Sequence, residues 1–315
     1  MWFVYILLCN NGSYYIGSSN NVDQRVKDHL NGKGGRFTRS HKPQKLVYTE
    51  ELLNKSEALK REAQLKKWSH AKKETIIAGN LKLLKNSRLA CISDMKLALL
   101  LPGFLDSPDY LHMKTFEKRL KELGYTTERL DPCNLWKTGN IEKYSITNYL
   151  KQIKERVSFY YLQNPEEIVL IGHSMGGFVS IIAGGRIQEV TKIVALCSPQ
   201  DRIKAADRWE GKKFLYSKRD LPEDPQKFRA FDVPYAFAED GCQYSAAEEV
   251  KKIHKPLMIF IALEDTVVPP EQTEEIVANA NNPYVVRQEN MGHDFRHSRK
   301  ECEIVMKQIE KFLLV

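Results

Sequence analysis

Residues 166–177, EEIVLIGHSMGG, decide how the larger part of this 315-residue chain folds. The apolar run 168–171 is typical of a parallel strand that is buried on both faces. The next residues fit Gly-x-Ser-x-Gly, a sharp turn from a strand into a helix with Ser174 at its tip. A serine at that tip projects its hydroxyl into a cleft at the positive end of a helix. The stretch therefore predicts a nucleophilic serine, although the same five-residue pattern also occurs by chance in loops.

Strand and helix patterns alternate from residue 95 to the end of the chain. Besides the strand before Ser174, strands are expected at 96–101, 126–130, 192–196, 257–262 and 284–288. Alternation of this kind predicts an α/β fold, a mostly parallel sheet flanked by helices. Residues 199–241 contain several prolines and aromatics and are expected to form an irregular insertion that caps the cleft.

A nucleophilic serine needs a base to take its proton and a third group to orient that base. Asp265 follows the strand expected at 257–262, and His293 follows the strand expected at 284–288. Both lie in loops at the carboxyl ends of strands, where Ser174 also lies. The order Ser174, Asp265, His293 predicts a catalytic triad. The alternative interpretation of each partner alone is an ordinary loop residue.

Hydrolysis through a tetrahedral intermediate also needs two backbone N–H groups that bind the developing oxyanion. Met175, directly after the serine, is one expected donor. The loop after the first strand, PGFL at 102–105, should supply the other. Phe104 is the predicted donor in this loop, and Leu105 is the alternative.

The motifs GHSMGG, LEDTVVP and GHDF together resemble the alpha/beta-hydrolase superfamily over residues 95–315. The resemblance implies hydrolysis of a carboxylic ester, thioester or amide through an acyl-enzyme, without a cofactor and on a small-molecule acyl substrate. The aromatic residues of the cap could line an acyl pocket or could equally fill the core. They are Trp209, Phe214, Tyr216, Phe228, Phe231, Tyr235 and Phe237.

The first 85 residues have a different pattern, a β-hairpin at 2–18 and a third strand at 45–49. Helices are expected at 22–30, 56–68 and 72–84, which together predict a small α+β domain. Its polar candidates could converge on a phosphodiester, or they could be ordinary strand residues and solvated helix faces. These candidates are Tyr5, Tyr15, Arg25, His29 and Glu62.

The segments WFVYILLCNNGSYYIGSSNNVDQRVKDH, KLVYTEE and SEALKREAQLKKW resemble the small stand-alone GIY-YIG endonuclease-like proteins. The first motif here is Val-Tyr-Ile instead of Gly-Ile-Tyr. The resemblance implies that Tyr5, Tyr15, Arg25 and His29 act in catalysis. It also implies that Glu62 holds a divalent metal such as Mg²⁺, and it makes Asn80 a candidate for an asparagine used in some members.

Charge is distributed unevenly between the two parts of the chain. Residues 1–90 carry a net charge of +10, and residues 91–315 carry −2. A basic first part fits a nucleic-acid backbone, and we expect DNA as its partner. A module that binds nucleic acid without cutting it remains an alternative, as does a pair of inactive interaction modules.

The remaining features concern the organisation and location of the chain. Residues 86–94 are expected to link a domain at 1–85 to one at 95–315, and the pattern at Met95 is that of a gene fusion. The six cysteines lack paired spacing, and no apolar run has the length of a membrane helix. We therefore expect a cytoplasmic protein with reduced cysteines and no membrane partner. The sequence predicts no oligomeric state.

Overall fold

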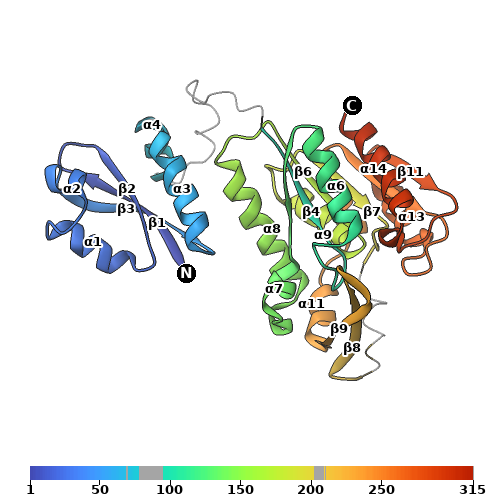
Figure 1. Ribbon diagram of the computed structural model, residues 1–315. Helices are drawn as coiled ribbons and strands as arrows, with labels where there is room; N and C mark the ends of the chain where they lie inside the picture. The colour runs from blue at the N-terminus through green and yellow to red at the C-terminus, as the bar shows by residue number, and fades with distance from the viewer. Residues whose placement is uncertain (69, 78–94, 202–208, 210, 315) are drawn as a thin grey trace. The chain divides into compact units, whose positions relative to one another are not determined.

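The arrangement in space comes from a computed structural model, in which the chain forms two compact units, Met1–Ile92 and Ser93–Val315 (Figure 1). The structure describes all residues except 69, 78–94, 202–208, 210 and 315. The expected linker and Asn80 therefore lie outside the described residues. Within them, no helix has the length and apolar content needed to cross a bilayer.

The first unit is built on a three-stranded antiparallel sheet in the order β2-β1-β3, which confirms the predicted small α+β fold (Figure 1). Its strands are β1 (Trp2–Cys9), β2 (Tyr14–Ser19) and β3 (Pro43–Leu52). Its described helices are α1 (Val22–Leu30), α2 (Arg36–Ser40), α3 (Lys55–Lys67) and α4 (His70–Ile77). The short helix α2 was not expected, because three glycines at 32–35 interrupt the sequence pattern before it.

Helix α3 brings Glu62 to the sheet. Asn54 caps its N-terminus, because the Asn54 side chain accepts a hydrogen bond from the N–H of Glu57. Ala58 and Leu65 on one face are fully buried, and the helix packs against β1 and β2. This packing fixes the direction in which the rest of the helix presents its side chains.

The second unit contains a six-stranded parallel sheet in the order β11-β10-β7-β6-β4-β5. Its strands are β4 (Lys96–Leu101), β5 (Tyr125–Arg129), β6 (Glu167–His173), β7 (Lys192–Leu196), β10 (Leu257–Ala262) and β11 (Tyr284–Gln288). The helices are α6 (Leu111–Glu122), α7 (Leu135–Thr138), α8 (Ile146–Tyr161), α9 (Met175–Arg186), α11 (Tyr235–Gly241), α12 (Ala246–Val250), α13 (Pro270–Asn279) and α14 (Arg299–Leu313). Short 3₁₀ turns are η1 (Pro132–Asn134), η2 (Ile141–Lys143) and η4 (Phe295–His297).

Strand β4 shows how both faces of this sheet are covered. Leu97, Leu99 and Leu101 pack into a cluster with residues of α8 and α9. Ala98 and Leu100 point the other way, into a cluster with residues of α6 and α14. Because successive strand residues face opposite sides, an apolar run is what a sheet with helices on both faces requires. The predicted α/β architecture is confirmed.

Residues 199–241 contain regular structure, so the expected irregularity is wrong, whereas the role of this region as a cap stays a prediction. Strands β8 (Phe214–Leu221) and β9 (Asp224–Pro234) form an antiparallel hairpin, and α11 follows it. Three of the aromatic residues of the region, Trp209, Phe231 and Phe237, are buried in the core. The other four, Phe214, Tyr216, Phe228 and Tyr235, are exposed. Within the hairpin, Phe231 and Val233 of β9 are buried and Asp232 between them is exposed, which is the alternation of a strand with one face on the protein.

Candidate functional sites

Ser174 lies between β6 and α9, at the sharp turn that the sequence predicts. Its backbone has φ 56° and ψ −121°, a region that side chains with a Cβ adopt rarely and at a cost. A Cβ on Gly172 would collide with the backbone of Gly176, and one on Gly176 would collide with Leu101. The two glycines of the motif therefore let the strand and the helix pass close enough to present Ser174.

Asp265 and His293 form a buried hydrogen-bonded pair. Asp265 Oδ2 lies 2.6 Å from His293 Nδ1, and the two residues are 4% and 8% exposed. The other oxygen, Oδ1, accepts the N–H groups of Val267 and Val268 at 2.9 and 2.7 Å. A carboxylate only accepts, so Nδ1 carries the proton and Nε2 is left with its lone pair. This is the tautomer that a general base requires.

Ser174 and His293 both line a cavity of about 460 Å³. Within the described part of the chain, no hydrogen bond joins the Ser174 hydroxyl to His293. Catalytic hydrogen bonds are often formed only once a substrate is bound. None of the seven cap aromatics lines the described wall, so the suggested aromatic acyl pocket is wrong for these residues. The lining residues are Phe104, Asp106, His173, Ser174, Pro199, Asp201, Arg219, Thr266, Val267, Val268, Gln272, His293, Asp294 and Arg296.

The loop after β4 forms a tight turn beside Ser174. The N–H of Asp106 donates to the carbonyl of Gly103 at 3.2 Å, and Leu105 between them has a left-handed φ of 57°. The N–H of Leu105 donates to the Tyr144 hydroxyl at 2.6 Å. Because that N–H already donates to Tyr144, this bond counts against Leu105, the alternative oxyanion donor, and Phe104 stays the predicted one.

Met175, the other expected donor, is the first residue of α9, and helices leave their first N–H groups without intrahelical partners. His173, on the other side of Ser174, was not among the predicted site residues. Its Nε2 lies 3.1 Å from the carbonyl oxygen of His293, and burial holds its pKa well below the usual range. A neutral His173 therefore donates to the backbone of the predicted base. Its place directly before the serine was the one signal that could have indicated this contact.

In the first unit, the structure brings Tyr5 and His29 together. The Tyr5 hydroxyl lies 2.9 Å from His29 Nε2, and His29 Nδ1 lies 2.9 Å from Thr38 Oγ1. Thr38 donates its own proton to the carbonyl of Gly35, so it accepts from Nδ1–H. His29 Nε2 is then the acceptor for the Tyr5 hydroxyl proton. Burial raises the pKa of Tyr5 to about 12 and lowers the pKa of His29.

Tyr15 and Arg25 also lie at this pair. The rings of Tyr15 and His29 are 4.7 Å apart, edge to face, and the positive charge of Arg25 acts on Tyr5, where it lowers the pKa against the larger effect of burial. Tyr5 and His29 are each 1% exposed, whereas Tyr15 and Arg25 are partly exposed. An incoming anion would therefore meet Arg25 before it met the buried pair.

Glu62 is partly exposed and engaged at both oxygens. Oε2 accepts from the Ser18 hydroxyl at 2.5 Å, and Oε1 pairs with Lys66 Nζ at 2.5 Å. A single carboxylate is the type of ligand that Mg²⁺ uses, because this ion keeps several waters. Lys66 already places a positive charge on the carboxylate. A metal ion bound at Oε1 would therefore have to displace Lys66.

Two glycines of this site were missed as functional residues. A Cβ on Gly17 would lie 2.5 Å from the Tyr5 hydroxyl oxygen. A Cβ on Gly34 would collide with His29 and Thr38. Gly17 belongs to the Tyr-Ile-Gly motif, which was the signal available, whereas Gly34 gave none because it lies between Gly32 and Gly35 in a glycine-rich segment.

Comparison with known proteins identifies the first unit. A family model described as the GIY-YIG catalytic domain matches residues 1–75. A UPF0213 protein of Staphylococcus epidermidis is 47% identical over 75 residues, 24% of this chain and 92% of that protein. One of Natronomonas pharaonis is 42% identical over 76 residues, 24% of this chain and 89% of that protein. The N-terminal part of the chain belongs to the GIY-YIG family and resembles these UPF0213 proteins along nearly their whole length.

Solved structures identify the fold of the second unit. A family model described as a PGAP1-like alpha/beta domain matches residues 143–226. Est1E from Butyrivibrio proteoclasticus, solved with ferulic acid bound, superposes with a TM-score of 0.58 at 22% identity, over 73% of this chain and 91% of that one. Mouse alpha/beta hydrolase domain-containing protein 10 superposes with a TM-score of 0.53 at 16% identity, over 69% of this chain and 89% of that one. The chain therefore joins a GIY-YIG domain to an alpha/beta-hydrolase fold.

Proposed function

We propose that the second unit hydrolyses carboxylic esters through an acyl-enzyme. Ser174 is the nucleophile, His293 the general base and Asp265 the group that orients the base. The 2.6 Å contact between Asp265 Oδ2 and His293 Nδ1, at the cavity that Ser174 also lines, carries the proposal. Est1E, solved with ferulic acid bound, adds an analogy at the level of the fold.

The residues define a sequence of proton transfers. His293 Nε2 takes the Ser174 hydroxyl proton as the oxygen attacks the ester carbonyl. The N–H groups of Met175 and Phe104 stabilise the resulting oxyanion. When the intermediate collapses, the C–O bond to the alcohol breaks and His293 returns the proton to that alcohol. A water then repeats the two steps on the acyl-enzyme, which releases the acid and restores Ser174.

The test is turnover of a short-chain p-nitrophenyl ester by the intact chain. Ser174→Ala should lower kcat by at least about a thousandfold, because the nucleophile is lost. A fluorophosphonate probe should label the wild type and leave this variant unlabelled. Unchanged turnover in Ser174→Ala would overturn the assignment. A parallel panel of thioesters and anilides separates the ester from the other two acyl substrates.

We also propose that the first unit cleaves DNA with a divalent metal such as Mg²⁺. Glu62 would hold the metal, whose charge favours departure of the leaving oxygen. Arg25 would bind the equatorial oxygens of the phosphate. The Tyr5–His29 hydrogen bond carries this proposal: with a pKa near 12, Tyr5 can accept a proton from water only as it passes its own to His29. Tyr15 would pack beside this relay.

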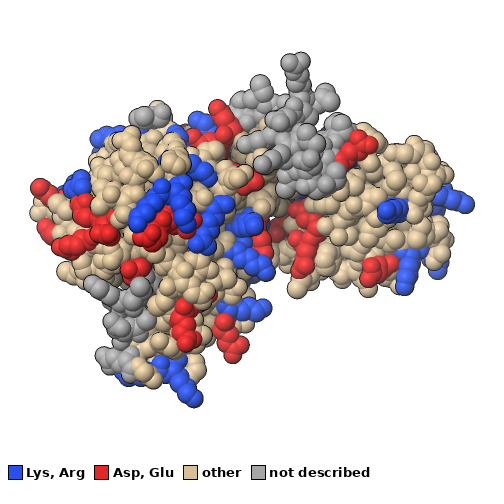
Figure 2. Space-filling view, turned by 180° about the vertical axis from the view of Figure 1, so that it is seen from behind, with Lys and Arg blue, Asp and Glu red and all other residues tan. Residues whose placement is uncertain are grey.

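Charge supports a polyanionic substrate, since residues 1–90 carry a net charge of +10. On the face of this unit shown in Figure 2, the basic side chains are spread out instead of forming one patch. This distribution fits backbone contact with little sequence selection. Binding should weaken steeply as salt is added.

Nicking of supercoiled DNA by the intact chain tests this second function. Activity should need Mg²⁺ or Mn²⁺ and should fall at least about a hundredfold in Arg25→Ala and in Glu62→Gln. If the wild-type chain binds DNA and cuts it in the absence of any divalent metal, the metal assignment is wrong. Binding without any cutting would identify a nucleic-acid-binding module instead, and failure of both assays would favour interaction modules.

We propose domain boundaries at 1–85 and 95–315 and a cytoplasmic location. The two compact units and the separate sites support the boundaries. Limited proteolysis should cut first between residues 86 and 94, and subcellular fractionation should recover the chain with cytoplasmic markers.

A further inference from the structure

A ring of four charged side chains lies beside the cavity and joins three separate segments. Asp106 comes from the turn after β4, Arg219 and Asp220 come from hairpin strand β8, and Arg296 comes from η4. Arg296 follows His293 by three positions. The ring thus connects the predicted oxyanion loop, the hairpin and the loop of the predicted base.

The distances close the ring. Arg219 Nε lies 3.3 Å from Asp106 Oδ1, and Arg296 Nη1 lies 3.4 Å from the same oxygen. Arg296 Nη2 lies 3.3 Å from Asp220 Oδ1. Asp220 is next to Arg219 on β8, so the ring closes at the hairpin. Asp106 is 5% exposed and Arg296 is 8% exposed, so both charges depend on these partners. The guanidinium of Arg296 also lies over the ring of Tyr110, 4.4 Å from its centroid.

Arg219 makes a second contact, directly to the turn. Its Nε and Nη2 donate to the carbonyl oxygen of Phe104 at 3.1 and 2.8 Å. That carbonyl and the N–H of Leu105 belong to one peptide group, and the N–H donates to Tyr144. Arg219 and Tyr144 therefore hold the same peptide plane from opposite sides.

Holding this plane matters because of the conformation of Leu105. A four-residue turn closed from Asp106 to Gly103, with a left-handed third residue, has the pattern of a type II turn. A residue other than glycine is strained there, and rotating the middle peptide would relieve that strain. The two hydrogen bonds oppose this rotation. Without them the turn at 103–106, which carries the Phe104 N–H in its preceding peptide, would lose two of the contacts that fix its backbone.

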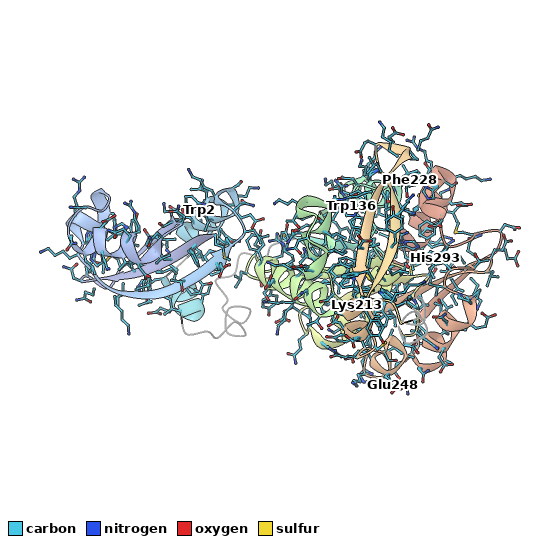
Figure 3. All side chains as sticks on the ribbon, turned by 90° about the horizontal axis from the view of Figure 1, so that it is seen from below. Trp2, Trp136, Lys213, Phe228, Glu248 and His293 are labelled. Carbon is cyan, nitrogen blue, oxygen red and sulfur yellow. The ribbon has the colours of Figure 1, made fainter. Side chains whose placement is uncertain are left out.

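We propose that Arg219 is a positioning residue that locks the turn at 103–106 in the geometry of an oxyanion hole. This inference rests on the esterase function proposed above. It makes the β8–β9 hairpin a structural part of the active site. Strand β9 supports the same loop, since Arg229 donates to the carbonyl of Trp136. Figure 3 labels Trp136 and, on β9, Phe228, the residue before Arg229. The indole N–H of Trp136 in turn donates to the carbonyl of Leu105 at 3.0 Å.

The experiment compares the intact wild-type chain with Arg219→Gln, Arg219→Lys and Arg219→Ala. Arg219→Gln should lower kcat about tenfold to a hundredfold with KM changed less than about threefold, because the oxyanion is a property of the transition state. Arg219→Lys keeps the positive charge and one donor group, so its kcat should lie between those of the wild type and of Arg219→Gln. Added guanidinium ion should restore part of kcat in Arg219→Ala.

A matched control and a readout without catalysis complete the design. Lys227→Gln removes an exposed pair with Asp224 on the same hairpin and should leave kcat unchanged. Hydrogen–deuterium exchange of the Leu105 amide should be faster in Arg219→Gln than in the wild type and in Lys227→Gln. This exchange reports on the turn even in a protein that hydrolyses no ester.

Two results would overturn the inference. One is an Arg219→Gln variant with wild-type kcat and wild-type exchange at Leu105. The other is a loss of kcat that follows a loss of folded protein and is not rescued by guanidinium. If the wild type neither turns over esters nor reacts with the serine probe, the esterase function fails, and the exchange rates still decide whether Arg219 locks the turn.

Discussion

His173 holds the backbone of His293, with its Nε2 3.1 Å from the His293 carbonyl oxygen. The side chain directly before the proposed nucleophile thus positions the proposed base, which lies 120 residues further along the chain. The residue next to Ser174 in the chain is thus tied by one hydrogen bond to the residue proposed to take the Ser174 proton.

Replacing His173 with Phe should lower kcat/KM for a short ester about tenfold. The substitution removes the donor and leaves a buried carbonyl unpaired, a loss of about 1–2 kcal/mol. His112→Phe is the matched control, because His112 is equally buried and contacts the His173 ring without donating to His293. The relationship would be contradicted if the two variants had the same kcat/KM.

Two buried imidazoles should make the second unit sensitive to acid. Burial lowers the pKa of His112 to about 3 and the pKa of His173 well below its usual range. Both are neutral when folded, whereas the unfolded chain binds a proton at each below about pH 6.5. The unfolded state then binds more protons, so stability is present above pH 6.5 and is lost as the pH falls.

Between pH 7 and pH 5, each of the two histidines should remove about 2 kcal/mol from the free energy of unfolding. Urea titrations of the intact chain at the two pH values measure the difference. His112→Phe should show a smaller difference than the wild type. Equal differences would mean that His112 does not contribute to the acid sensitivity.

Much of this architecture could be predicted because it follows from local pattern. Apolar strands that alternate with helices define a parallel sheet, and parallel strands place Ser174, Asp265 and His293 at one edge. The chain order and the loop positions were therefore enough to select these three residues. The GIY-YIG domain could be recognised because its motifs are contiguous.

What could not be predicted depends on contacts between distant segments. The pairing of Asp106 with Arg219 joins positions 113 apart, and no periodicity connects them. The β8–β9 hairpin was missed because prolines and aromatics obscured the alternation of its strands. Thr38 was missed since its role exists only once α2 has brought it to His29 Nδ1. The ion pair, the hairpin and the Thr38 contact each depend on tertiary packing and not on local secondary-structure propensity.

Gly17→Ala should disable the proposed nuclease without unfolding its domain. The added Cβ would lie 2.5 Å from the Tyr5 hydroxyl oxygen, so the phenol must shift away from His29. DNA nicking should fall at least about tenfold, with DNA binding preserved. Gly35→Ala is the control, because a Cβ at Gly35 meets nothing within 4 Å. Equal nicking by the two variants would exclude a role for the Tyr5–His29 contact.

A buried charge lies directly before Glu62 in α3. Arg61 is 1% exposed and its Nε pairs with Glu50 Oε2 at 2.8 Å. Glu50→Ala would leave the guanidinium buried without this partner, at a cost of about 3–5 kcal/mol. The free energy of opening, measured by hydrogen exchange of the β1 amides in the intact chain, should fall by that amount.

Glu51→Ala, at the neighbouring exposed position of β3, should change the exchange of β1 by less than about 0.5 kcal/mol. The double variant Glu50→Leu with Arg61→Met should recover most of the loss, because it replaces both charges with apolar groups. If Glu50→Ala exchanges like Glu51→Ala, then the pair does not stabilise the domain. Recovery in the double variant would instead show that the loss in Glu50→Ala came from the unpaired charge of Arg61. Arg61 directly precedes Glu62, the proposed metal ligand.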